Sequence, residues 1–207
     1  DVTGICSGVP NNMDTLSSGS NSTTNVFVSD AKAGKIFQIW PRSRTAVYQV
    51  YKDKREKPEC LCWMNDKLFT NSISTSQNLL VLDTTKVPYQ QKKKIRLTNF
   101  RFVLAITKLV TEPGGNEKLL LCGRYFNGCG VVECFDVQTL APQWKTEQNY
   151  LGQTLLASGV CSGMFQKKPL VLIADMMNDR ILAVQHFSGS CKKVVLAGKE
   201  DHHIRPD

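Results

Sequence analysis

The chain has 207 residues, of which 42% are hydrophobic and 21% charged, and its formal net charge is +8. This composition is typical of a globular protein and excludes an intrinsically disordered chain, and no apolar run approaches the ~18 residues that span a membrane. The positive charge either favours acidic partners, such as nucleic acid, anionic membranes or acidic proteins, or serves only solubility.

Short apolar segments separated by Gly, Asn, Asp, Ser or Pro recur along the whole chain. They are rich in β-branched and aromatic residues, or alternate between apolar and polar residues, and both patterns predict strands. No longer stretch carries the apolar stripe of an amphipathic helix. The predicted strands cover residues 26–28, 35–40, 45–51, 67–70, 78–82, 95–97, 102–110, 118–122, 130–135, 169–174, 180–186 and 193–197.

One pattern recurs four times: an apolar strand, a small or polar residue, a turn and a second apolar strand. The small or polar residues are Asp30, Asn71, Gly123 and Asp175, and the intervals from 30 to 71, 71 to 123 and 123 to 175 are 41, 52 and 52 residues. A period of about 40–50 residues is typical of propeller blades. The repeat therefore favours a propeller over a sandwich or a barrel.

Each repeat can be laid out as four antiparallel strands. The inner strands are predicted at residues 2–7, 59–64, 102–110 and 156–165, and the outer strands at 45–51, 93–97, 143–146 and 192–197. We thus predict an all-β propeller of four-stranded blades, as one segment over residues 1–207. Its blades are expected at about 1–54, 55–99, 100–152 and 153–203, with residues 204–207 starting a further blade.

Two of the repeats resemble a known family. Val171-Leu-Ile-Ala-Asp175-Met-Met-Asn178-Asp-Arg180-Ile181 is similar to the NHL repeat, and the segment from Val26 to Ile36 is a second match. The resemblance implies that Asp30 and Asp175 hold tight turns and that Arg180 is the arginine of the motif. In the other two repeats, Asn71 and Gly123 replace the Asp. The resemblance also implies that the four blades are part of a six-bladed disc, with a closed ring of four blades as the alternative.

The same resemblance extends to function. NHL propellers include those of the tripartite-motif ubiquitin ligases, which implies a cytoplasmic, non-catalytic module that recruits protein substrates or RNA. Any ligase activity would then reside outside this chain. The alternative is an extracellular binding propeller, for which the sequon at Asn21 and the eight cysteines would gain weight.

Basic residues cluster on two of the predicted outer strands and their flanking turns. Lys and Arg side chains contact phosphates, and interleaved Tyr rings can stack on bases, so these residues are candidate RNA ligands. Lysines on an edge strand also prevent aggregation without any ligand, and that alternative stays open. The candidates are Arg42, Arg44, Lys92, Lys93, Lys94 and Arg96.

The sequence shows no catalytic motif, and we expect neither enzymatic activity, nor a cofactor, nor a metal. His186, His202 and His203 lack partners at metal-ligand spacing. Cysteines group at residues 60 and 62 and at 122, 129 and 134. They are interpreted as buried small hydrophobic residues, with a disulfide or a metal site as alternatives.

Overall fold

The computed structural model describes residues 2–8, 25–39, 47–73, 77–109, 117–150, 152–165, 168–187 and 190–198. Arg42, Arg44, His202, His203 and residues 204–207, about which the sequence makes predictions, lie outside these ranges. Within them the structure is strand throughout except for turns and one three-residue 3-10 helix, η1 (Met176–Asn178). No helix in these ranges is long and apolar enough to cross a membrane.

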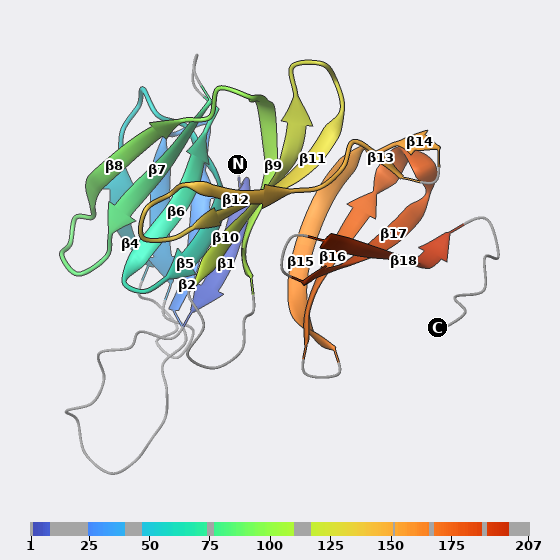
Figure 1. The fold of residues 1–207 in the computed structure, drawn as a ribbon. Coiled ribbons are helices and arrows are strands. Elements are labelled where there is room, and N and C mark those ends of the chain that lie inside the picture. The colour runs from blue at the N-terminus through green and yellow to red at the C-terminus, as the bar shows by residue number, and fades with distance from the viewer. Residues whose placement is uncertain are drawn as a thin grey trace, which may run out of the picture. The chain divides into compact units, whose positions relative to one another are not determined.

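The first compact unit (Asp1–Thr98) holds two four-stranded antiparallel sheets (Figure 1). In both, each strand pairs with the next strand along the chain. Blade 1 contains β1 (Gly4–Gly8), β2 (Asn25–Asp30), β3 (Lys35–Ile39) and β4 (Val47–Lys52). Blade 2 contains β5 (Pro58–Met64), β6 (Lys67–Ser72), β7 (Asn78–Asp83) and β8 (Gln90–Arg96).

The second unit (Asn99–Asp207) repeats this arrangement and adds the short hairpin β13 (Asn149–Tyr150) and β14 (Gln153–Thr154) between its two sheets along the chain. Blade 3 contains β9 (Phe100–Leu109), β10 (Lys118–Tyr125), β11 (Gly130–Asp136) and β12 (Pro142–Lys145). Blade 4 contains β15 (Ala157–Phe165), β16 (Lys168–Asp175), β17 (Arg180–Phe187) and β18 (Ser190–Gly198).

Each unit has an apolar core between its two blades. Phe27, Ile36 and Val50 of blade 1 pack with Leu61, Leu68, Leu80, Leu82 and Tyr89 of blade 2. In the second unit, Leu120, Val132 and Cys134 of blade 3 pack with Val171, Ile173, Leu182 and Val184 of blade 4. Each blade thus lays one apolar face against its neighbour. The second and third strands of blades 2 and 3 are buried at nearly every position and do not alternate.

Most predicted strands lie close to observed ones, but two details differ. The outer strand of blade 2 begins at Gln90, before its predicted start, because polar and charged side chains gave no apolar signal there. The β13–β14 hairpin was not predicted, because two-residue strands are too short to carry a periodic pattern.

Candidate protein-binding surface

Asp30 and Asp175 each end the second strand of their blade, but the structure gives them different contacts. Asp30 is half-buried, and its Oδ1 accepts a hydrogen bond from the backbone N–H of Ala33 at 2.9 Å, which stabilises the turn. This bond lowers the pKa of the Asp30 carboxyl. Asp175 is fully buried and forms part of a network.

The Asp175 carboxylate joins three segments of the second unit. Its Oδ2 accepts a hydrogen bond from Nε of Arg180 at 2.7 Å, and Nδ2 of Asn178 donates to both of its oxygens at 2.9 Å. Its Oδ1 also accepts the backbone N–H of Leu156 at 2.9 Å, just before the inner strand β15. Since Arg180 is also buried, each charge depends on the other for its stability.

Asn71 and Gly123 lie one residue pair further from the turn than the two aspartates. Asn71 pairs with Leu79 and Gly123 with Val131, and each is followed by one more pair before the turn. Asn71 nevertheless resembles Asp175 in one contact, since its Oδ1 accepts the N–H of Cys60 on its own inner strand at 2.8 Å. Gly123 has no side chain that could accept such a hydrogen bond. The inner strand β9 also leaves no room for a side chain here, because an added Cβ would lie 2.0 Å from the carbonyl oxygen of Phe102.

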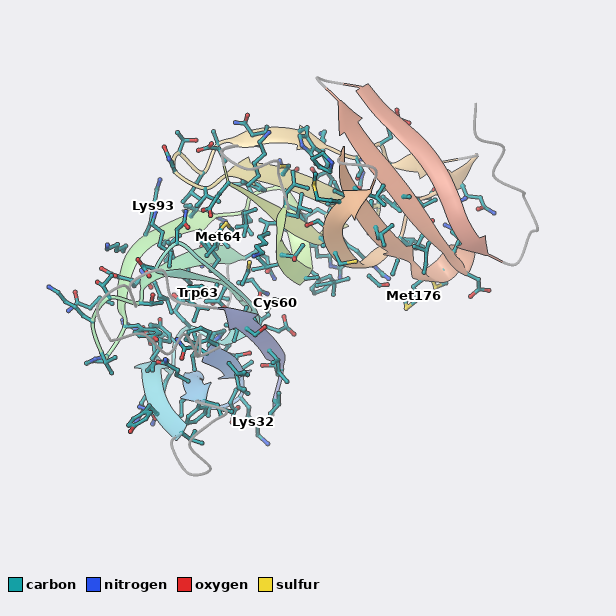
Figure 2. All side chains as sticks on the ribbon, turned by 90° about the horizontal axis from the view of Figure 1, so that it is seen from below. Lys32, Cys60, Trp63, Met64, Lys93 and Met176 are labelled. Atoms are coloured by element: carbon teal, nitrogen blue, oxygen red, sulfur yellow. The ribbon has the colours of Figure 1, made fainter. Side chains whose placement is uncertain are left out.

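Lys92, Lys93, Lys94 and Arg96 are all exposed on β8, and Figure 2 shows Lys93 on this outer strand. Acids distant in the sequence approach two of them. Lys92 Nζ lies 2.7 Å from Asp83, and Lys94 forms an ion pair with the buried Glu56. Lys92 and the hydroxyl and N–H of Thr85 lower the pKa of the Asp83 carboxyl. Residues 86–101, which include β8, contain no acidic residue. In the fold, however, Asp83 and Glu56 neutralise part of the positive charge of this segment.

None of the seven cysteines whose side chains the structure describes is in a disulfide. Burial raises the pKa of Cys6, Cys60 and Cys134 to about 12, so these thiols stay protonated at neutral pH and are poor nucleophiles and metal ligands. In the described ranges no three His, Cys, Asp or Glu side chains gather as metal ligands. The side chain of His186 lies outside the described part.

The described carboxylates with lowered pKa serve turns rather than a reaction centre. Besides Asp30 and Asp83, Asp53 accepts the N–H of Arg55, and Asp136 accepts the N–H and hydroxyl of Thr139. These bonds lower the pKa of both carboxyls. A general base that works near neutral pH needs its pKa shifted upward instead, and burial shifts the pKa of Glu133 on β11 in that direction.

Exposed apolar side chains gather on two turns of the second unit. Phe126, in the β10–β11 turn, is 67% exposed, and Met176 and Met177, in the β16–β17 turn, are 55% and 64% exposed. Figure 2 shows Met176 pointing away from its sheet. The next residue of each turn contacts the segment that holds the β13–β14 hairpin. Asn127 Nδ2 lies 3.5 Å from Gln148 Oε1, and Asn178 Nδ2 donates to the carbonyl of Thr154 at 2.9 Å.

We call Phe126, Met176 and Met177, with the β13–β14 hairpin, the turn surface. Backbone hydrogen bonds fix its base: Leu155 donates to Gln148 at 2.8 Å, and Gly130 donates to Leu155 at 2.7 Å. Large exposed apolar side chains on hydrogen-bonded turns are typical of protein interfaces, and methionine adapts its shape to different partners.

Sequence reasoning missed this surface because Phe and Met count as core residues by default. A local signal was present. Phe126 precedes Asn127-Gly128, and the two methionines stand between Asp175 and Asn178. Turn-forming residues beside large apolar ones place the apolar side chains at a loop tip, where they are exposed.

Comparison with known proteins finds similar folds but no family to which the chain can be assigned. No family model matches the chain, and no curated protein does. Among solved structures, the chain is similar to one from a mitotic checkpoint complex, with 16% identity, a TM-score of 0.53, and coverage of 83% of this chain and 47% of that one. It is also similar to a putative 6-phosphogluconolactonase from Bacteroides uniformis, with 10% identity, a TM-score of 0.54, and coverage of 91% and 59%.

The chain has a β-propeller fold of four-stranded antiparallel blades, as the repeat predicted. It spans about half the length of the solved structures that it matches. At these identities the likeness concerns the fold alone, and one fold hosts many functions.

Proposed function

We propose that this chain is a non-catalytic recognition scaffold that binds protein partners through the turn surface. The observation that carries the proposal is the exposure of Phe126, Met176 and Met177 on two turns joined to one hairpin segment. The similarity to a propeller from a multi-protein checkpoint complex supports a protein partner.

The finer form of the proposal is an NHL-like propeller that recruits substrates for a ubiquitin ligase. It rests on the resemblance of the segment from Val171 to Ile181 to the NHL repeat; in this segment Asp175, Asn178 and Arg180 form one hydrogen-bonded network. The same resemblance implies a cytoplasmic protein. An extracellular propeller is the alternative.

Selection of peptides from a random library on the intact chain tests the proposal. We expect the selected peptides to carry large apolar residues. They should bind the double variant Phe126→Ser/Met177→Ser at least about tenfold more weakly, because hot-spot side chains contribute most of the binding energy. The control is Val87→Ser, at an apolar residue that is 66% exposed outside the turn surface. Equal binding to both variants would refute the proposal.

RNA binding is the second candidate, and it rests on the exposed basic strand β8. Lys93 and Arg96 are the residues to replace, because their substitution leaves the ion pairs of Lys92 with Asp83 and of Lys94 with Glu56 in place. Replacing these two with Ala should lower affinity for a single-stranded RNA and reduce the dependence of log K on log salt by about 1.4 if both engage. Absence of binding to the intact chain at low salt would exclude this function.

An enzymatic function, such as that named for the bacterial lactonase, has weaker support. The carboxylates whose pKa is lowered are engaged in turns. Incubation of the chain with 6-phosphogluconolactone should leave the rate of hydrolysis at the level of buffer alone, and an increase that depends on protein concentration would contradict the scaffold proposal.

A further inference from the structure

Blade 1 carries apolar residues on both faces, and one of these faces packs against blade 2. The strands place Ile5, Val28 and Phe37 side by side in one row across the sheet, and Val26, Ile39 and Val47 in the next. These six residues point away from Phe27 and Ile36, which pack against blade 2. We call them the open face of blade 1.

This face differs from the surface of a sheet that water covers. Ile5 is 64% and Val47 59% exposed, and the other four residues are half-buried. An antiparallel sheet with one face in water normally carries polar residues on that face. A covered blade looks different: β6 and β7 of blade 2 are buried at nearly every position. The open face of blade 1 thus has the composition of a covered blade face.

Blade 4 carries a matching face. Leu182 and Val184 pack toward blade 3, so their neighbours on β17 point the other way. Ile181, which is 42% exposed, pairs there with Ala174, and Leu170 and Leu172 lie on the same side of β16. We call Leu170, Leu172, Ala174 and Ile181 the open face of blade 4. The residues named on the two open faces are uncharged, so contact between them buries no charge. On blade 1 the next row of the same face, Asp30, Lys35 and Lys52, is charged and bounds the apolar part.

We propose that the open face of blade 4 of one copy of this chain docks on the open face of blade 1 of a second copy. The contact would continue the blade-on-blade packing that the chain already forms within each unit. A second copy is the occupant because each copy presents both halves of such an interface. The interface is heterologous, since different surfaces of the two copies meet.

Light scattering over a series of concentrations tests this proposal on the intact chain. The apparent mass should rise from 23.1 kDa toward at least twice that value. Val47→Lys or Ile181→Lys should raise the dissociation constant at least about tenfold, because each buries a charge in an apolar contact. Both residues are exposed, so the chain should still fold, and cooperative unfolding followed by circular dichroism checks this. Val87→Lys is the matched control and should leave the mass unchanged.

Mixing the two variants tests the pairing of the faces. The Val47→Lys chain keeps an intact blade 4 face and the Ile181→Lys chain an intact blade 1 face, so the mixture should form dimers while each variant alone stays monomeric. A wild-type chain that is monomeric at every concentration overturns the proposal. So does association that survives both substitutions, or a mixture that stays monomeric. Association that is lost instead in Phe126→Ser would assign the contact to the turn surface and also overturn it.

Discussion

Asp175 shows how a single side chain can organise a blade. Its carboxylate binds Arg180, Asn178 and the backbone before β15, and both charges of the ion pair are buried. We expect Asp175→Ala to lower the free energy of unfolding by about 3–5 kcal/mol, because it removes one partner of a buried ion pair. Urea unfolding followed by fluorescence measures the loss.

Two comparisons make this prediction specific. Asp30→Ala, at the end of the second strand of blade 1, should cost clearly less, because Asp30 is half-buried and its bond to the N–H of Ala33 holds a turn rather than a buried ion pair. The double variant Asp175→Ala/Arg180→Met should be more stable than Asp175→Ala alone, since it also removes the buried guanidinium charge. If all three variants lost the same stability, the ion pair would not be the cause.

Glu133 is a second residue whose environment can be tested. It is buried on β11 and accepts a hydrogen bond from the Tyr125 hydroxyl, and burial raises the pKa of its carboxyl, although Lys145 opposes the shift. A raised pKa in the folded state means that stability is greatest below the ordinary Glu value of about 4.3 and falls as pH rises through the shifted value.

Glu133→Gln should therefore be more stable than the wild type at pH 7.5, because Gln can still accept the Tyr125 bond without carrying a charge. The difference should shrink toward zero near pH 4. Thermal or urea unfolding at the two pH values measures it. A variant that is less stable than the wild type at pH 7.5 would show that the charge itself stabilises blade 3.

Among the strands, glycine is required where two backbones approach each other closely. The inner strand β9 shifts register against β10 beside Gly123, and an added Cβ would lie 2.0 Å from the Phe102 carbonyl oxygen. Gly123→Ala should force the two strands apart and cost about 1–3 kcal/mol. Gly163→Ala on β15 is the control, because a Cβ there meets no atom within 4 Å. Equal unfolding midpoints for the two variants would contradict this.

The strands were predictable because each blade repeats apolar runs broken by turn residues. Contacts between distant residues were not. The repeat places Asn71 and Asp175 at similar positions, but it does not reveal the backbone N–H that each accepts, from within β5 for Asn71 and from just before β15 for Asp175. It also gives no sign that Glu56 pairs with Lys94. Such pairs depend on how neighbouring segments pack, which spacing along the chain does not encode.

For the whole molecule, function follows from which surfaces the blades leave uncovered. The turn surface presents Phe126, Met176 and Met177 on backbone fixed by hydrogen bonds, and the edge strand β8 presents a basic surface that is partly neutralised by Asp83 and Glu56. The first favours an apolar protein partner, whereas the second weakens the case for nucleic acid.

The central claim is that partners bind at the turn surface, and photo-cross-linking tests it most directly. A photo-reactive phenylalanine analogue is placed at position 177, at position 153 in the β13–β14 hairpin, or at position 87, and each chain is irradiated with a peptide selected on the wild type. We expect cross-links from positions 177 and 153 and none above background from position 87. Cross-links from position 87 alone, or equal yields at all three positions, would contradict the claim.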